Sequence, residues 1–435
     1  MFEPKNEIII IDNNAQHLET LSKRFHTNGI GCMEFEYDAM YESPLLGVRI
    51  AFFDINLLDL GGGERRIFNT LALALKQYIS IDNGPFALVF WTSNSEMIER
   101  FKEYVQNRHP DCPKPFVTKF IDKDEFLVGN DGELQNEIEN ILSDDVLKLM
   151  FDFESLVKSA SSNVIDEIYK IIPNNDDWGA NANFSVNFEK VFSKISTSMR
   201  GFDGAKNNPD RAVFEALLPI LTHQVMKKVT SNKWRTYLQS LNLATKYGDL
   251  RNPNGFRESN LNSVFHIDNE PTTNDARGVV IKMNRHHQKV LGIFGMSYRE
   301  WLDKFVPFKK NTEIQRASVE ALIVKSELVA IEISSSCDYQ QDKSRLNKYV
   351  YGVKFPIIPK NLLGSSKDSA LNISNYVTSN QEFEIWLNLN YVFGARTNDK
   401  VFEKSTHLFT FKKEIMDMLG NRYANHVSRI GITSF

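Results

Sequence analysis

The stretch "IAFFDINLLDLGGGE", residues 50–64, decides the fold of the first part of the chain. Its apolar run ends at the carboxylate of Asp54, and a cluster of glycines follows. Short, nearly continuous apolar runs are typical of strands buried on both faces of a parallel sheet. We therefore expect Asp54 to lie at the carboxyl edge of such a sheet, where open α/β folds bind their ligands.

Similar runs recur on both sides of this stretch, and helical patterns separate them. The expected strands are "EIIIID" (7–12), "GCMEFEY" (31–37), "RIAFFD" (49–54), "FALVFWTS" (86–93) and "PFVTKFI" (115–121). The expected helices are "NAQHLETLSKRFHTNG" (14–29), "RRIFNTLALALKQYI" (65–79), "SEMIERFKEYVQN" (95–107, with Ser95 as its cap) and "GELQNEIENILSDDVLKLM" (132–150). Strands that alternate with helices predict an α/β fold, a doubly wound five-stranded parallel sheet of the flavodoxin-like type with right-handed crossovers.

The rest of the chain has a different pattern. Helices dominate from about residue 144 to 248, and a polar loop rich in Asn, Gly and Pro follows at 248–263. Beyond it the sequence predicts an α+β domain, with strands in 276–284, 321–336, 348–359 and 383–394 and a last helix in 411–431 that is interrupted at Gly420. The expected domains are a first domain at 1–143, a helical connector at 144–250 and an α+β domain of unknown activity at 251–435.

Composition narrows the class of protein. The 435 residues are 42% apolar and 24% charged, with a net charge of −4, which argues against wholesale electrostatic binding of nucleic acid or of an anionic membrane. The three cysteines are far apart, and their spacing fits neither a disulfide framework nor a zinc site. With no signal peptide and no apolar run long enough to span a membrane, we expect a cytoplasmic protein.

Polar groups follow four of the five expected strands. These groups are Asp12 with Asn13, then Asp54, then Thr92 with Ser93, and finally Lys123. Carboxylates are hard oxygen ligands that suit Mg²⁺, and a carboxylate can also attack phosphorus to form an acyl phosphate. A hydroxyl and a lysine would bind the added phosphoryl oxygens. The set therefore points to metal-assisted phosphoryl transfer.

These residues resemble the receiver domain of two-component response regulators over the first third of the chain. The resemblance implies that Asp54 is the phosphoacceptor, that a partner histidine kinase supplies the phosphoryl group, and that Mg²⁺ is the cofactor. By position it implies a metal site formed by Asp12, Asn13, Asp54 and the main-chain carbonyl of Asn56, with Thr92 and Lys123 as catalytic partners. Gly62 lies near the usual glycine of the family, and Phe120 lies where the family has its switch aromatic.

The chain departs from the family pattern in several places. Asn13 replaces an acid, Leu58 replaces the usual proline, and Asp124 follows Lys123 in place of a second proline. Lys119 is the alternative lysine, but it would lie inside the strand. A second interpretation follows from these departures. The domain would be a degenerate pseudo-receiver that serves as an interaction scaffold, and the protein could then form a homodimer through it.

A third interpretation places an enzyme in the C-terminal domain. In "IEISSSCDYQQDKSR" (331–345) an apolar strand runs into Cys337 and Asp338, a candidate nucleophile and a candidate acid. The alternative is that Cys337 is a buried apolar residue and that Asp338 caps a turn. An unusual effector fused to a receiver would suit a stress or phage-defence system, by analogy of architecture alone.

Overall fold

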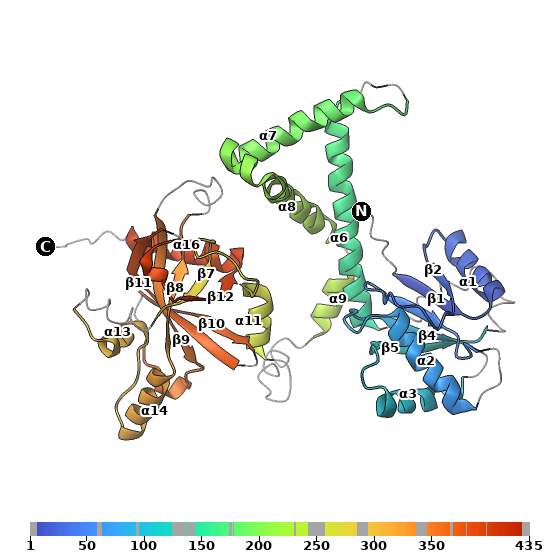
Figure 1. Ribbon diagram of the computed structural model, residues 1–435, viewed down its shortest axis with the longest axis horizontal. Coiled ribbons are helices and arrows are strands. Elements are labelled where there is room, and N and C mark those ends of the chain that lie inside the picture. Colours follow the sequence, from blue (N-terminus) through green and yellow to red (C-terminus); the bar gives the residue numbers. More distant parts are fainter. Residues whose placement is uncertain are drawn as a thin grey trace. The chain divides into compact units, whose positions relative to one another are not determined.

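The computed structural model describes most of the chain (Figure 1). The described residues are 7–58, 63–92, 95–123, 136, 144–173, 176, 178–229, 232–241, 257–284, 295–335, 346–365, 369–379, 381–396 and 398–428. The chain forms two compact units, one of residues 1–165 with 223–239 and the other of residues 166–222 with 240–435. The division at residues 143 and 250 stays a prediction.

The first unit contains the predicted parallel sheet. Its strands are β1 (Ile8–Asp12), β2 (Met33–Glu36), β3 (Ile50–Phe53), β4 (Ala87–Trp91) and β5 (Val117–Ile121). They lie in the order β2-β1-β3-β4-β5, and every neighbouring pair is parallel. This is the strand order of flavodoxin-like folds, so the predicted fold class is confirmed.

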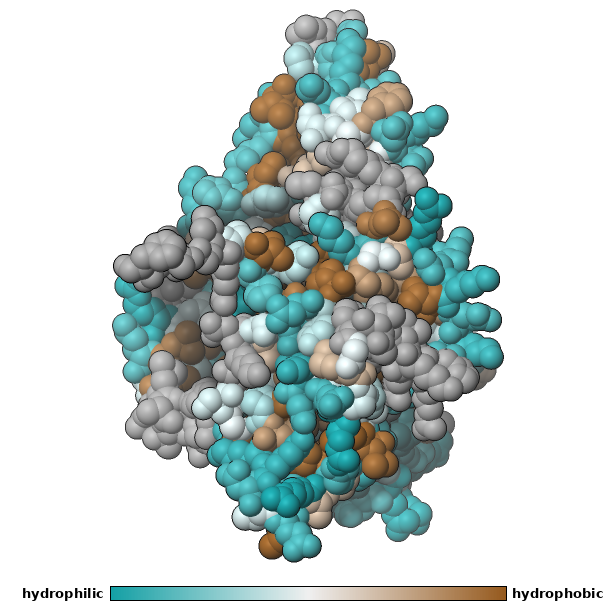
Figure 2. All heavy atoms as spheres, turned by 90° about the vertical axis from the view of Figure 1, so that its left-hand side faces the viewer, coloured by the Kyte–Doolittle hydropathy of each residue, from teal (hydrophilic) through white to brown (hydrophobic). Residues whose placement is uncertain are grey.

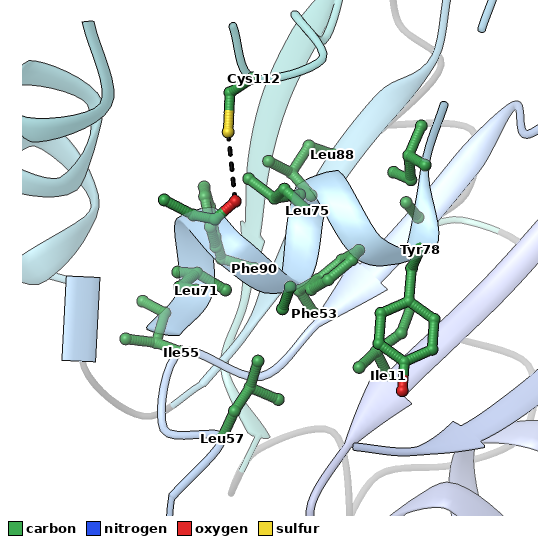
Figure 3. Close-up of a cluster of buried hydrophobic side chains, with 14 of the residues drawn as sticks. Ile11, Phe53, Ile55, Leu57, Leu71, Leu75, Tyr78, Leu88, Phe90 and Cys112 are labelled. Atoms are coloured by element: carbon green, nitrogen blue, oxygen red, sulfur yellow. Dashed lines mark hydrogen bonds between the residues drawn. The ribbon is translucent and has the colours of Figure 1, made fainter. Parts of the chain in front are cut away.

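Helices cover both faces of this sheet, as the alternating pattern requires. They are α1 (Ala15–Thr27), α2 (Glu64–Tyr78) and α3 (Met97–Arg108), joined by the start of α6 (Asp145–Ile171). On one face, Leu71, Leu75 and Tyr78 of α2 pack on Phe53 and other strand residues, and the Cys112 thiol donates to the Ala72 carbonyl at 3.2 Å (Figure 3). Cys112 is a core residue, and its burial raises the pKa of this thiol to about 11.

Two helix starts show how local chemistry sets the element boundaries. The Asn14 side chain caps α1 by accepting hydrogen bonds from the main-chain N–H groups of Gln16 and His17. The prediction for Ser95 is wrong, because α3 begins after Glu96 and Ser95 contributes only a main-chain carbonyl that accepts from Ile98. The Ser95 hydroxyl is one residue too early to reach the free N–H groups.

Helix α6 begins in the core of the first unit. Asp144 caps it through the N–H groups of Val146 and Leu147, and the Leu147 side chain is fully buried among the residues of α1, β1 and β5. The Arg49 guanidinium also donates to the Glu154 carboxylate at 2.7 Å. The first turns of α6 therefore pack with α1 on the face of the sheet opposite to α2. Of the helix predicted at 132–150, only residue 136 and residues from 144 onward are described.

Three more helices follow α6, in agreement with the predicted helical region. They are α7 (Ala182–Asn207), α8 (Pro209–Lys228) and α9 (Asn232–Ser240). Helix α7 is kinked at Gly201, whose φ of 71° lies in the left-handed region that glycine tolerates best.

The C-terminal part of the chain forms a seven-stranded antiparallel sheet with helices. The strands are β6 (Ile267–Asp268), β7 (Val279–Lys282), β8 (Glu327–Glu332), β9 (Asn347–Pro356), β10 (Ala370–Thr378), β11 (Gln381–Ala395) and β12 (Thr406–Phe411), in the order β10-β11-β9-β8-β7-β12-β6. The helices are α11 (Glu258–His266), α13 (Tyr298–Phe305), α14 (Glu313–Val324) and α16 (Lys413–Val427). The predicted α+β class is confirmed.

Both faces of this second sheet are buried. Trp301, Leu302 and Phe305 of α13 pack on one face, and Ile415 and Met416 of α16 pack on the other. On the outside, Figure 2 shows hydrophilic residues over much of the visible face, with apolar residues in smaller groups between them. The core clusters on the two faces of this sheet share no residue with the clusters around the parallel sheet.

Three details of the C-terminal prediction are wrong. Residues 321–324 end α14, which a capping box at Thr312 starts, so the strand begins only at Glu327. Strands β10 and β12 were not predicted, because polar residues interrupt their apolar pattern. Helix α16 continues through Gly420, where an added Cβ would meet no atom within 4 Å; an exposed helical glycine weakens a helix without ending it.

Candidate functional site

The sheet order brings the two predicted acids together. Strands β1 and β3 are neighbours, and the Asp54 N–H donates to the Ile11 carbonyl at 3.0 Å, which continues their pairing to the edge of the sheet. Asp12 ends β1 and Asp54 follows β3, so their side chains emerge at the same carboxyl edge. Their exposed fractions are only 1% and 6%. Two buried carboxylates need a compensating cation.

Lys123 supplies that cation. Its ammonium donates to Asp12 Oδ2 at 2.7 Å and to Asp54 Oδ2 at 3.2 Å, and the Lys123 side chain is itself buried. Lys123 follows β5, so its side chain reaches across the end of β4 to Asp54 after β3, and across the ends of β4 and β3 to Asp12 at the end of β1. The shared ammonium shows that both carboxylates point to one place.

The other oxygen of each carboxylate is held by the main chain. Asp12 Oδ1 accepts from the Asn14 N–H at 2.9 Å, and Asp54 Oδ1 accepts from the Asn56 N–H at 3.3 Å. In both cases the donor lies two residues after the acid, the geometry of an Asx turn. These turns fix the carboxylate planes, so that each Oδ2 atom faces the lysine.

The environment of Asp54 changes its acidity. Burial is the largest influence and raises the pKa of the Asp54 carboxyl above its ordinary value, and the nearby Asp12 carboxylate raises it further. The Lys123 ammonium and the Asn56 N–H act in the opposite direction but do not cancel the effect of burial on this pKa. Asp54 is therefore more basic than an exposed aspartate.

The remaining candidates lie near this edge or outside the described residues. Thr92 is buried at the end of β4, and its N–H donates to the Ile121 carbonyl at 3.2 Å. Phe120 is 37% exposed, and Asn13 is half-buried next to Asp12. Ser93, Gly62, Asp124, Cys337 and Asp338 lie outside the described residues, so the speculative effector site has no geometry.

Sequence reasoning missed His17, whose Nδ1 lies 3.8 Å from Asp12 Oδ2. A signal existed: His17 comes three residues after the Asn14 cap, so it lies in the first turn of the helix that follows β1. The first turn of such a helix starts at the edge where the strand ends. His17 therefore belongs to the surroundings of the two acids.

The donor set is compatible with a magnesium ion. Among the described residues there is no group of three or more His, Cys, Asp or Glu side chains that could hold a metal. Mg²⁺ does not need one, because it keeps several waters and is commonly bound through one or two carboxylates. Asp12 and Asp54 provide two convergent carboxylates, and the Asn13 amide and the Asn56 carbonyl are further oxygen groups beside them in the chain.

The scan against protein-family models finds no match for this chain, and no curated protein matches it. In the part of the chain that the structure describes, there is no helix with the length and apolar character needed to cross a membrane. The case for a function therefore depends on the geometry of the site.

Proposed function

We propose that the chain is a response-regulator-like signalling protein whose N-terminal domain is a receiver with Asp54 as phosphoacceptor. The observation that supports this most is the Lys123 ammonium between Asp12 and Asp54, at the carboxyl edge of a parallel sheet with flavodoxin-like order. Folding alone does not require a buried lysine between two strand-end acids, because apolar residues of similar size at these positions would avoid the free-energy cost of burying charges.

Asp12, Asp54, the Asn13 amide and the Asn56 carbonyl would hold Mg²⁺. The bound ion would reduce the repulsion between the Asp54 carboxylate and the incoming phosphoryl oxygens. Because Asn13 is neutral, this site carries one formal charge fewer than a set of three acids. We therefore expect weaker magnesium binding than in a receiver with an acid at that position.

In the reaction, an Asp54 oxygen attacks the phosphorus of a phosphohistidine on a partner kinase. The new O–P bond forms as the P–N bond breaks, and the departing imidazole keeps the electron pair of the P–N bond and takes a proton from water. The Lys123 ammonium, already 3.2 Å from Asp54 Oδ2, is in reach of the added phosphoryl oxygens. The Thr92 hydroxyl would donate to the same group.

The phosphoryl group would change the surface around β4 and β5. Movement of Thr92 toward the phosphoryl oxygens would leave space for the partly exposed ring of Phe120 to turn inward. This two-state change would control the C-terminal domain as an atypical effector in the cytoplasm.

The experiment is intact-mass measurement after incubation with acetyl phosphate and Mg²⁺. Wild type should gain the mass of one phosphoryl group, Asp54→Asn should gain none, and Asp82→Asn, at an exposed loop acid, should behave as wild type. If wild type gains nothing from acetyl phosphate or from phosphorylated histidine kinases, the proposal is wrong and a non-phosphorylated interaction scaffold replaces it.

A further inference from the structure

His17 presents a buried nitrogen to the acid at the end of β1. Its Nδ1 atom lies 3.8 Å from Asp12 Oδ2 and makes no hydrogen bond within the part of the chain that the structure describes. The His17 side chain as a whole is 31% exposed, so another part of the ring reaches solvent. Few buried polar atoms in folded proteins lack a hydrogen bond, and a bound ion is one common reason for such an atom.

Asn14, which lies between the two residues in the chain, fixes the positions of both. Its main-chain N–H donates to Asp12 Oδ1 at 2.9 Å, and its side-chain oxygen accepts from the main-chain N–H of His17 at 3.3 Å. The same residue thus orients the Asp12 carboxylate and sets where the His17 side chain leaves the first turn of α1. The approach of the two side chains is therefore built into the connection between β1 and α1.

The distance between the two atoms suits shared binding of a cation. Two ligand atoms that each lie about 2.1 Å from one ion are about 3.0 Å apart at a right angle and about 3.4 Å apart in a tetrahedron. His17 Nδ1 and Asp12 Oδ2, at 3.8 Å, would have to approach each other by less than about 1 Å. They are too far apart for a hydrogen bond to each other.

Positive charge already lies at the same carboxylate oxygen. The Lys123 ammonium is 2.7 Å from Asp12 Oδ2 and 3.2 Å from Asp54 Oδ2. A metal ion bound to Asp12 would replace this ammonium as the compensating charge. Lys123 would then be available for the phosphoryl oxygens on Asp54, as the proposed function requires.

We propose that His17 Nδ1 and Asp12 Oδ2 bind the same divalent cation, and that His17 makes the site prefer first-row transition-metal ions to Mg²⁺. Imidazole nitrogen suits transition metals, whereas Mg²⁺ is bound almost entirely through oxygen. The Asn13 amide stands where a third carboxylate would favour Mg²⁺. His17 supplies a further ligand of a different chemical type beside it.

The pair is only part of a coordination shell. In the described ranges of the chain, no three His, Cys, Asp or Glu side chains are already arranged to hold a metal. Water and oxygen groups near Asp12 would therefore supply the other ligands. This inference rests on the proposed function, because it takes Asp12 as a metal ligand, and it changes the identity of the expected ion.

The test is electron paramagnetic resonance of the full chain with Mn²⁺. The signal of free Mn²⁺ gives the affinity, and electron spin echo envelope modulation detects a nitrogen bound directly to the ion. Wild type should show a bound nitrogen. His17→Leu should lose the nitrogen signal and should bind Mn²⁺ at least about tenfold more weakly, whereas its Mg²⁺ affinity, measured by calorimetry, should hardly change.

Three further variants make the result specific. His26→Leu, in the last turn of the same helix, is the matched control and should behave as wild type. Asp12→Asn should remove most of the Mn²⁺ binding, which places the ion at this acid. His17→Asn, whose side-chain oxygen can take the place of Nδ1, should keep most of the Mn²⁺ affinity without the nitrogen signal. It keeps the test decisive if His17→Leu does not fold.

The outcomes separate this inference from the proposed function. Mn²⁺ that binds in an Asp12-dependent way without a bound nitrogen, or a nitrogen signal that persists in His17→Leu and His17→Asn, would overturn the role of His17 and leave phosphorylation of Asp54 intact. A wild type that binds neither Mn²⁺ nor Mg²⁺ would overturn both proposals.

Discussion

At the scale of single residues, Asp54 carries a conflict between stability and chemistry. The carboxylate is buried beside a second acid, and both conditions disfavour its charged form. As the proposed phosphoacceptor, Asp54 would have to be ionised to attack phosphorus. The Lys123 ammonium and the Asn56 N–H favour the ionised carboxylate and offset part of the effect of burial on its pKa.

We expect Asp54→Asn to stabilise the first unit at neutral pH. Because folding raises the pKa of Asp54 above 3.8, the folded state binds this proton more tightly, and the free energy of unfolding falls as pH rises through the folded-state pKa. Asparagine does not ionise, so the Asp54→Asn variant does not lose this free energy of unfolding. The variant should therefore be more stable than wild type at pH 7, and the difference should vanish in acid. Urea unfolding at both pH values measures this, with Asp82→Asn as the exposed control. A destabilised Asp54→Asn at pH 7 would mean that the attraction to Lys123 outweighs burial.

Removal of Lys123 should be strongly destabilising. Lys123→Met leaves two buried carboxylates side by side, and loss of one partner from a buried ionic group costs about 3 kcal/mol or more. Lys119→Met, at the half-buried lysine inside β5, should cost less. The measurement is urea unfolding at pH 7.

A double variant separates the two contributions. Lys123→Met/Asp54→Asn should recover part of the lost stability, because only one carboxylate is then left without the ammonium. If the double variant is no more stable than Lys123→Met, the contact between Lys123 and Asp54 accounts for little of the stability that is lost when Lys123 is replaced.

The sequence predicted the two acids more securely than their partner. Asp12 and Asp54 end continuous apolar runs, so periodicity alone places them at one edge. Lys123 is 111 positions from Asp12, and no local pattern relates the two; resemblance to a family singled it out. His17 was missed because a histidine in a first helical turn is usually a solvated residue.

At the scale of elements, Leu147 shows how α6 is attached to the parallel sheet. The side chain is fully buried, whereas its neighbour Val146 is 39% exposed. Leu147→Ala should cost about 3 kcal/mol, and Val146→Ala less than about 0.5 kcal/mol. Amide hydrogen exchange in β1 and β3 should report the difference. Equal effects of the two substitutions would show that α6 does not stabilise the sheet.

Gly352 and Gly420 form a second pair for comparison. In β9, a Cβ at Gly352 would lie 2.6 Å from Leu387 Cδ2 and 3.2 Å from the Trp386 carbonyl oxygen, so Gly352→Ala should cost about 1–3 kcal/mol. In α16, Gly420 has open space, and Gly420→Ala should add up to about 1 kcal/mol. Urea unfolding of both variants checks these signs; a neutral Gly352→Ala would mean that the neighbouring strands shift freely.

The two sheets differed in how well the sequence predicted them. Parallel strands buried on both faces are continuous apolar runs, and all five were found. Strand β10, "ALNISNYVT", mixes asparagine and serine with apolar residues, since its side chains are only partly covered. Its pairing partner β11 lies just beyond a turn at residue 379. The pairing with β11 therefore determines that this segment is a strand more than the apolar pattern of its own sequence does.

At the scale of the whole molecule, two units with separate cores should unfold in separate steps. The clusters around the parallel sheet and those around the antiparallel sheet share no residue. In calorimetry we expect two transitions, with Leu147→Ala lowering one midpoint and Gly352→Ala the other. A single transition that both substitutions lower equally would show that the units are thermodynamically coupled.

The length of helix α6 restricts which insertions the helix can accept during evolution. Its 27 residues are one uninterrupted helix, and the boundary between the two compact units falls within it, after residue 165. Its buried side chains include Leu149 and, three turns later, Ala160 and Val164. One residue inserted between Leu149 and Ala160 would turn Ala160 and Val164 by about 100° about the helix axis and shift them by about 1.5 Å. An insertion of seven residues, close to two full turns, would nearly restore the direction in which these two side chains point. Variation within this helix should therefore occur in whole helical turns and not in single residues.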